Sequence, residues 1–341
     1  MTPAERPAGV PLPSTSTSTA TATAAVTASS SAASASASAA ERRLAEIGVV
    51  VVMVLWAANF IVVKSAVAQL PPVGFTFLRF VLASVTLLLL LRWREGSIGL
   101  PRRDLVAILA LGAIGFGAYQ ILWTTGLTTV PAGDSALLIA ATPVLVALLA
   151  VVARTDVLTP VKLIGILVSF VGVVIVVGSG PGLTLGRSLV GEALTLAGAV
   201  CWSVYTAFGA PYVRRHSPLR ATAWATVAGT VVLAPIAVLQ LGSLDRVPLG
   251  LDVIGAILYS GMLAAGVANV VVLNGVKVVG PTRTAALQFL VPALAVLLAF
   301  LFLQEPIRPG QVVGGLVIVG GVLITRGGLP FRVIRVDRPR S

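Results

Sequence analysis

Residues 72–91 read PVGFTFLRFVLASVTLLLLL, a run of twenty residues in which Arg79 is the only charged side chain. A helix of about 20 apolar residues is long enough to cross the roughly 30 Å of hydrocarbon in a bilayer. With a rise of about 1.5 Å per residue, Arg79 lies only about 3 Å from the centre of such a helix. The run therefore predicts a membrane-spanning helix that carries a cation near the middle of the bilayer.

Apolar runs of similar length recur along the chain and are separated by short polar breaks that contain Pro and Gly. Lipid offers no partner for the edge of an open strand, so these runs should be helices. We therefore predict an all-α integral membrane protein with ten transmembrane helices. The ten runs are 44–66, 72–91, 104–127, 134–153, 160–178, 190–210, 219–241, 252–273, 284–303 and 309–325.

The composition excludes the common soluble classes. Of 341 residues, 57% are hydrophobic and only 11% are charged, whereas soluble domains have about 45–50% and about 25%. The net charge of +12 does not indicate a nucleic-acid partner, because Lys and Arg are spread between the apolar runs. A single cysteine, Cys201, and a single histidine, His216, exclude an internal disulfide and make a Cys- or His-based metal site implausible. We expect a lipid bilayer as the surroundings and no cofactor.

The distribution of positive charge predicts the orientation. If the N-terminus is cytoplasmic, 19 of the 24 Lys and Arg residues fall in inside segments. Only Arg187, Arg246 and Arg308 fall in outside loops, and Lys64 and Arg79 lie within helices. Since cytoplasmic loops are enriched in Lys and Arg, we expect a multi-pass protein of the cell (plasma) membrane with both termini in the cytoplasm.

The first 43 residues differ from the rest. From Ser14 to Ala40 every residue is Ser, Thr or Ala except Val26. Such a segment has little large apolar surface to bury and is predicted to be disordered. The expected organisation is a tail over 1–43, a first five-helix repeat over 44–178, an outer linker over 179–189, a second five-helix repeat over 190–325 and a basic tail over 326–341.

The two halves are related in sequence. A shift of 149 residues aligns 112–175 with 261–324 without a gap and gives 18 identities in 64 positions, including Pro143 with Pro292. Segments this rich in Ala, Val, Leu and Gly would match by chance at about 6–8 positions. Five helices per half is an odd number, so the halves should cross the membrane in opposite senses. Inverted repeats of this kind place a binding cavity at their interface and allow alternating access.

The sequence also resembles a known family. Trp56-x-x-Asn59-Phe60-x-x-x-Lys64, Pro71 and Arg79-Phe80 in the first half are similar to the opening of the EamA-like family of the drug/metabolite transporter superfamily. Gly191, Trp202-x-x-Tyr205, Pro292 and Glu305-Pro306 are similar to its second half. The resemblance covers about 44–325. It implies ten helices in two inverted halves and the export of small metabolites through a central cavity.

Polar and aromatic residues within the runs are the candidates for a substrate cavity. A guanidinium near the bilayer centre costs at least about 2.5 kcal/mol, so Arg79 should face the bundle or a wet cavity. It could anchor a substrate carboxylate or phosphate, or clamp neighbouring helices. Each of the others could instead make an interhelical hydrogen bond or pack in the core. The candidates are Arg79, Trp56, Asn59, Lys64, Tyr119, Gln120, Trp123, Trp202, Tyr205, Asn269 and Gln288.

Proline and glycine suggest where helices bend and meet. Pro143 and Pro292 lie in the middle of the fourth and ninth runs, where each should kink the helix as a gating joint or a static bend. Gly310 and Gly314, with Gly165 and Gly172 in the matching fifth run, should permit close helix approach. That approach could be packing within the bundle or a homodimer through the fifth and tenth helices.

Together these features favour a secondary transporter that exports small metabolites, such as amino acids, by alternating access. The alternatives are a passive channel, a membrane protein that transports nothing, and a polytopic membrane enzyme. An enzyme needs a nucleophile and base, or metal ligands, at one depth, and the sequence supplies neither. There is no G-x-x-x-x-G-K-[ST] phosphate loop, and no Asp or Glu lies in the central third of any run.

Overall fold

The computed structural model describes residues 16–153, 157–179, 187–244 and 250–325. Within these ranges every regular element is a helix and no strand is found. Eight helices are long and apolar enough to cross a membrane, which confirms the prediction of a helical, multi-pass membrane protein. They are Ala40–Val67, Pro72–Glu95, Arg102–Leu127, Ala132–Val152, Pro160–Gly178, Leu189–Arg215, Pro218–Gly242 and Leu251–Val278.

The ninth and tenth predicted runs form shorter helices than expected. The ninth is divided into α12 (Pro281–Leu287) and α13 (Leu290–Leu303), of which α13 has 14 residues. The tenth is α14 (Pro309–Thr325), with 17 residues. Two residues outside the helices separate α12 from α13, so the hydropathy of the run predicted its location but not its continuity. The described part of the chain thus has eight full-length spans where the sequence predicted ten.

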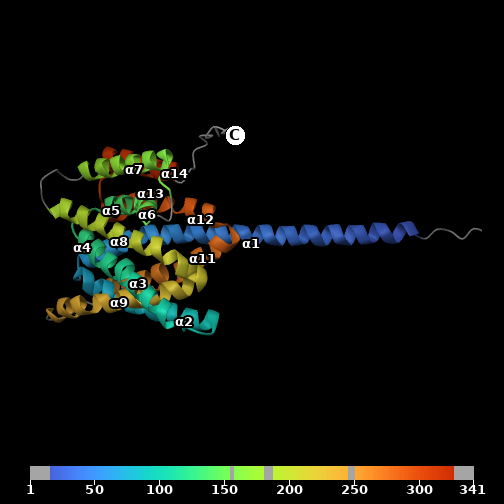
Figure 1. The fold of residues 1–341 in the computed structure, drawn as a ribbon, viewed down its shortest axis with the longest axis horizontal. Helices are drawn as coiled ribbons and strands as arrows, with labels where there is room; N and C mark the ends of the chain where they lie inside the picture. The colour runs from blue at the N-terminus through green and yellow to red at the C-terminus, as the bar shows by residue number, and fades with distance from the viewer. Residues whose placement is uncertain (1–15, 154–156, 180–186, 245–249, 326–341) are drawn as a thin grey trace, which may run out of the picture.

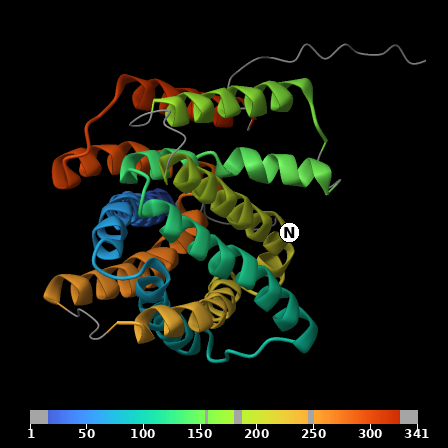
Figure 2. The same cartoon turned by 90° about the vertical axis from the view of Figure 1, so that its left-hand side faces the viewer.

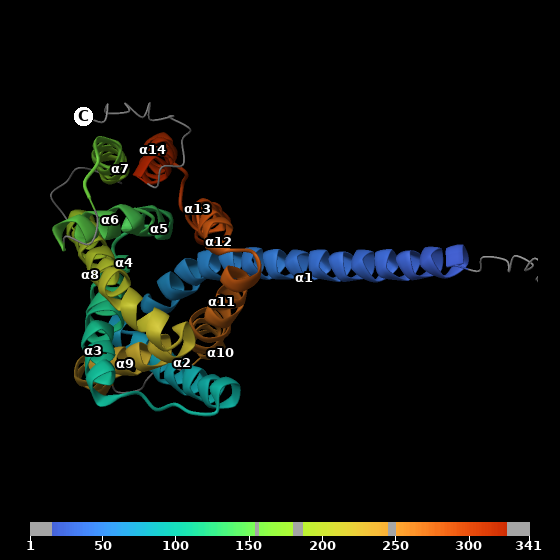
Figure 3. The same ribbon diagram turned by 45° about the vertical axis from the view of Figure 1, so that its right-hand side comes forward.

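The N-terminal tail also differs from its prediction. The first helix, α1 (Ser16–Val67), begins 28 residues before the first apolar run, inside the segment predicted to be disordered. No Gly or Pro lies between Ser14 and Ile47, and Ala is the strongest helix former, so nothing in this stretch ends a helix. Figures 1 and 3 show α1 extending well beyond the other helices. Residues 1–15, most of the linker over 179–189 and the tail over 326–341 lie outside the described residues.

The two central prolines begin helices. Pro143 is the second residue of α6 (Thr142–Val152), which follows α5 (Ala132–Ile139) after a two-residue break. Pro292 is the third residue of α13, after the break that follows α12. Proline is tolerated in the first helical turn because the N–H that it lacks would have no partner there. The fourth and ninth runs are thus each built from two helices.

Two spans contain a π-helical turn at corresponding places. The third span consists of α3 (Arg102–Gly112), η1 (Ala113–Ala118) and α4 (Tyr119–Leu127). The eighth consists of α10 (Leu251–Leu258), η2 (Tyr259–Val267) and α11 (Ala268–Val278). The shift of 149 found in the sequence places η1 over residues 262–267, inside η2. Such turns are rare and often occur at functional sites.

The helices pack in layers. Figure 2 shows α7 (Pro160–Gly178) and α14 side by side at one edge of the molecule, next to the layer that holds α5, α6 and α13. On the far side of that layer lie α1 and α8 (Arg187–Arg215), and beyond them α2 (Pro72–Glu95) packs along α9 (Pro218–Gly242). Helices from both halves of the sequence therefore meet in each layer.

Glycines allow α7 and α14 to touch through their backbones. A Cβ on Gly172 would lie 2.8 Å from the carbonyl oxygen of Gly314, and one on Gly165 would lie 2.7 Å from that of Gly321. Ser169 donates a hydrogen bond to the Ile318 carbonyl at 3.2 Å. The predicted close approach is thus made within one chain. The predicted homodimer would have to use other faces of these helices.

The α7–α14 contact can be tested with a matched pair of substitutions. A side chain at Gly172 would meet the Ile318 nitrogen at 2.6 Å, whereas nothing lies within 4 Å of a Cβ at Gly178 on the same helix. We expect Gly172→Val to lower the free energy of unfolding by about 1–3 kcal/mol, as overpacking does. Gly178→Val should change it by less than about 0.5 kcal/mol. Titration with SDS from mixed micelles measures both, and equal effects would contradict the contact.

Candidate functional site

The predicted intramembrane cation is buried inside the bundle. Arg79 on α2 is 2% exposed, and its Nη2 donates to Oε1 of Gln120 on α4 at 2.7 Å. The guanidinium carbon lies 5.2 Å from the ring centre of Phe80, 5.7 Å from that of Trp123 and 5.9 Å from that of Phe75. Aromatic faces attract cations at such distances. An amide oxygen and three rings therefore surround the charge.

No carboxylate in the described part of the chain balances this charge. Among the residues that the structure describes, none of the ion pairs includes Arg79. Its Nε is buried and has no hydrogen-bond partner. A buried donor without a partner costs about 1–3 kcal/mol, and more when it is charged. The arrangement is therefore suited to accept an anionic group that it does not itself contain.

Aromatic side chains extend from this cation toward α8. Tyr119 stacks on Trp123 with ring centres 5.9 Å apart, and Trp202 lies 5.6 Å from Tyr119 and 5.4 Å from Tyr205. Phe116 on η1 packs edge-on against Trp202 and Tyr205. Trp123 also donates from Nε1 to the buried Ser135 hydroxyl at 3.0 Å. Six predicted residues, Arg79, Tyr119, Gln120, Trp123, Trp202 and Tyr205, are thus brought together.

Four other predicted residues lie apart from this cluster. Trp56 donates from Nε1 to the Ala264 carbonyl of η2 at 3.0 Å. Asn269 donates to the Ala265 carbonyl of the preceding turn at 2.6 Å. Gln288 is exposed at the break between α12 and α13. Asn59 has a buried Oδ1 without a partner.

Lys64 is the remaining candidate from the sequence. It is on α1, and its side chain reaches the turn between α4 and α5. Its Nζ donates to the carbonyls of Leu127 at 2.6 Å and Val130 at 2.7 Å. The Glu305 carboxylate lies at the other end of the same turn, where it accepts the backbone N–H of Ala132 at 2.9 Å. A cation at a helix C-terminus and an anion at an N-terminus are both favourable. In this structure Lys64 thus has a structural role.

A buried ion pair joins this region to α14 and α7. Asp134 is fully buried, is paired with Arg308 and accepts from Gln311 Nε2 at 2.9 Å. Arg308 also donates to the Ser179 carbonyl at 2.6 Å. The sequence predicted only that no acidic residue, Asp134 and Glu305 included, lies in the central third of a run. Their partners lie more than 170 positions away along the chain, so periodicity gives no signal for these contacts.

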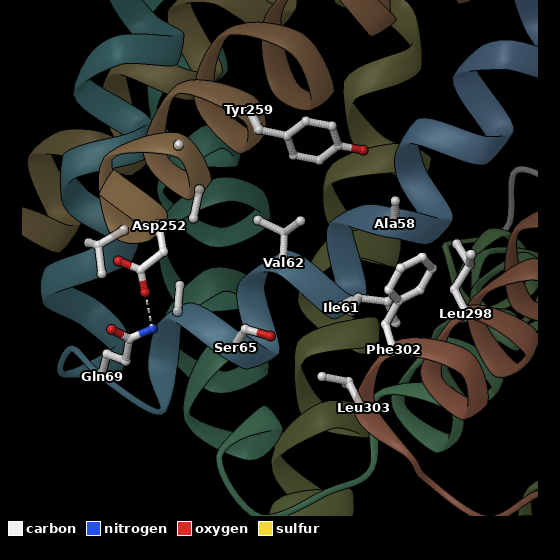
Figure 4. Close-up of a pocket in the computed structure, with 14 residues that line it drawn as sticks. Ala58, Ile61, Val62, Ser65, Gln69, Asp252, Tyr259, Leu298, Phe302 and Leu303 are labelled. Carbon is white, nitrogen blue, oxygen red and sulfur yellow. Dashed lines mark hydrogen bonds between the residues drawn. The ribbon is translucent and has the colours of Figure 1, made fainter. Parts of the chain in front are cut away.

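A separate cavity of about 580 Å³ lies between α1, the α10–η2 segment and α13 (Figure 4). None of the predicted site residues lines it. Its walls are mainly aliphatic, but Gln69 Nε2 donates to the Asp252 carboxylate at 2.6 Å at one end. The sequence could not single out these residues, because apolar residues that face a cavity look like those that face lipid. In the described part of the chain, no group of three His, Cys, Asp or Glu residues could hold a metal ion.

Both halves of the chain match one known family. The sequence model of the EamA-like transporter family matches twice, over residues 43–178 and 189–327. The chain belongs to the EamA-like transporter family. The resemblance seen in the sequence is thereby confirmed, and a transporter role is supported.

Curated EamA-like relatives carry transporter names. The chain is 30% identical over 278 residues to the probable terminal-alkyne amino-acid exporter of Streptantibioticus cattleyicolor, covering 81% of this chain and 91% of that protein. It is 29% identical over 286 residues to the uncharacterized transporter YyaM of Bacillus subtilis, covering 82% and 91%. A protein of known crystal structure has a similar fold, with a TM-score of 0.58 at 20% identity, covering 83% of this chain and 96% of that one.

The buried ion pair of this EamA-like chain predicts a specific loss of stability. Asp134→Asn should lower the free energy of unfolding by about 3 kcal/mol, because it leaves the Arg308 charge without its partner. The control is Glu46→Gln, which removes the solvent-exposed pairs with Arg42 and Arg283 and should cost less than about 1 kcal/mol. SDS titration of the purified proteins compares the two. A cost for Asp134→Asn no larger than that for Glu46→Gln would contradict a structural role for the pair.

Proposed function

We propose that the chain is a secondary transporter of the plasma membrane that exports small metabolites, such as amino acids, by alternating access. Family membership supports a transporter role. The relative named as a probable amino-acid exporter, at 30% identity, supports the substrate class and the direction. No curated relative compared above is named as an enzyme.

The architecture that we propose has ten crossings in two inverted halves, 44–178 and 190–325, joined by an outer linker over 179–189. The double match to one family model supports it. The paired π-helical turns and the paired breaks at Pro143 and Pro292 support it as well. The bias of Lys and Arg favours cytoplasmic termini. In this arrangement α12 and α13 together form the ninth crossing and α14 forms the tenth. The 17 residues of α14 are near the lower limit for a span.

The observation that carries the proposal is the unpaired charge of Arg79. A substrate carboxylate would supply the missing countercharge and accept the hydrogen bond that Nε does not make in this structure. Gln120 fixes the orientation of the guanidinium, and Tyr119 and Trp202 supply aromatic walls for the rest of the substrate. Charge-assisted hydrogen bonds to a carboxylate are strong and directional. An amino acid has the chemistry that this site recognises.

Alternating access requires parts of the chain to move relative to each other. The breaks between α5 and α6 and between α12 and α13 are the proposed hinges, since each interrupts a run near its middle. The contacts of Lys64, Glu305, Asp134 and Arg308 hold the turn before α5 against the segment before α14. In our proposal they close one end of the transport path in this conformation.

The proposed activity is tested by counterflow. Purified protein in proteoliposomes preloaded with unlabelled amino acids should accumulate the same labelled amino acids transiently, with a rate that saturates as their external concentration rises. A passive channel would give flux that does not saturate, and an enzyme would give a labelled product. Absence of counterflow for all twenty amino acids, with correctly folded protein, would contradict the substrate class.

The role of Arg79 is tested by Arg79→Met, which keeps an unbranched apolar stem and removes the charge and its hydrogen-bond donors. We expect transport to fall at least about tenfold, because a charged hydrogen bond worth about 1.5–3 kcal/mol is lost. The melting temperature should change little, because loss of the bond to Gln120 is offset by removal of a buried charge that has no countercharge among the described residues. Arg94→Met, at the exposed end of the same helix, should leave transport unchanged. Loss of stability with transport retained would show a structural clamp instead of an anchor.

The number of crossings is tested by cysteine labelling. Cys201→Ser supplies the background, into which Arg94→Cys, Thr128→Cys, Lys277→Cys or Gln304→Cys is introduced singly; all four positions are exposed. A maleimide that cannot cross the membrane should label Thr128→Cys and Gln304→Cys from outside intact cells. It should label Arg94→Cys and Lys277→Cys only after permeabilisation. Labelling of Lys277→Cys and Gln304→Cys from the same side would exclude the ninth crossing.

A further inference from the structure

The cavity between α1, α10–η2 and α13 has the form of a binding site. Ala58, Ile61, Val62 and Ser65 line it along one face of α1, and Leu298, Phe302 and Leu303 of α13 lie opposite. Figure 4 shows their side chains around a shared space. Its volume of about 580 Å³ is within the range of about 300–1,000 Å³ found for small-molecule sites. Shape and lining therefore fit a ligand with an apolar body.

One end of this cavity carries a negative charge. The Asp252 carboxylate accepts a hydrogen bond from the neutral amide of Gln69 at 2.6 Å. In the part of the chain that the structure describes, no Lys, Arg or His forms an ion pair with it. Asp252 also lies in the first turn of α10, where a negative charge stabilises the helix by interacting with the positive end of its dipole. The interaction with the helix dipole does not neutralise the carboxylate, so the mouth of the cavity attracts cations.

Aromatic rings complete the lining. The Tyr259 hydroxyl donates to the Leu55 carbonyl at 2.7 Å, which fixes the ring as part of the wall. Phe302 lies across the cavity from the Asp252 end in Figure 4. Aromatic faces favour cations, and more strongly where water is excluded. The lining therefore offers an acidic end and an apolar, partly aromatic wall.

We propose that this cavity binds an organic cation with an apolar body, with the positive group at Asp252 and the body against α1 and α13. This site is separate from the one at Arg79. That site carries a positive charge, and none of its residues lines this cavity. The inference goes beyond the proposed export of amino acids and does not depend on it. A lipid acyl chain is a poorer match, because it carries no positive group to pair with the carboxylate at the cavity mouth.

The charge requirement is tested by equilibrium binding of radiolabelled tetraphenylphosphonium to the purified full-length protein in detergent. Asp252→Asn removes the charge but keeps an oxygen for Gln69, and we expect it to weaken binding about two- to fivefold, because the carboxylate is exposed and solvent screens its charge. Glu46→Gln removes an acidic charge from α1 away from the cavity lining, and it should leave binding unchanged.

The location is tested by filling the cavity. Gly255 lines it, and nothing lies within 4 Å of a Cβ built there. Gly255→Leu therefore enters open space and should abolish binding without lowering the melting temperature. Gly320→Leu on α14 is the matched control, since its Cβ also meets nothing within 4 Å and it does not line the cavity. Its binding should equal that of the unsubstituted protein.

Weaker binding in both cavity variants, with both controls intact, supports the proposal. Equal affinity of Asp252→Asn and the unsubstituted protein would overturn it, because the carboxylate would then not recognise the cation. Displacement of the probe by excess diacylglycerol, which has acyl chains but no charged group, would also overturn it and would indicate an acyl chain as the occupant. The assay needs no transport, so failure of amino-acid counterflow leaves its outcome unaffected.

Discussion

The hydrocarbon core of a membrane supplies no hydrogen-bond partners, so the protein itself must satisfy its backbone polar groups there. Continuous helices meet this requirement along their length, but the last carbonyls and first N–H groups of each helix have no partner within it. Two such helix ends meet in the turn between α4 and α5. There the Lys64 ammonium group bonds to two carbonyls and the Glu305 carboxylate accepts a backbone N–H. The charges of Lys64 and Glu305 therefore satisfy backbone groups that are left without partners where α4 ends and α5 begins. They also tie α1 and the segment before α14 to one turn.

Two buried charges in this chain illustrate two different situations. Asp134 has Arg308 and Gln311 as partners, so its charge is neutralised within the protein. Arg79 has one amide, three rings and an unused Nε. Desolvating a charge is costly unless a partner compensates it. The first arrangement is complete without a ligand, and the second is not. This contrast, more than burial itself, distinguishes a candidate binding group from a structural one.

The sequence predicted the features that can be read from the residue types within a single segment. Apolar run length located the spans, and the cost of a guanidinium in lipid placed Arg79 inside the bundle. Contacts between helices that are distant in the sequence could not be predicted from it. Gln120 was a candidate site residue, but its bond to Arg79 depends on how α2 and α4 pack. Asn269, in α11, bonds to the preceding turn of the same span, in η2, which a repeat alignment cannot reveal. The break before Pro292 and the helical start of α1 at Ser16 depend on local backbone geometry, which hydropathy does not contain.

The pairing of α7 with α14 has a consequence for the origin of the fold. Gly165 meets Gly321, and Gly172 meets Gly314, while the sequence repeat relates Gly165 to Gly314 and Gly172 to Gly321. Each helix therefore contacts the counterpart of its own surface, in antiparallel register. A surface of this kind is self-complementary. A shorter ancestor that encoded one half alone would have had a ready face for joining an oppositely oriented twin, and gene duplication would then have fused the two.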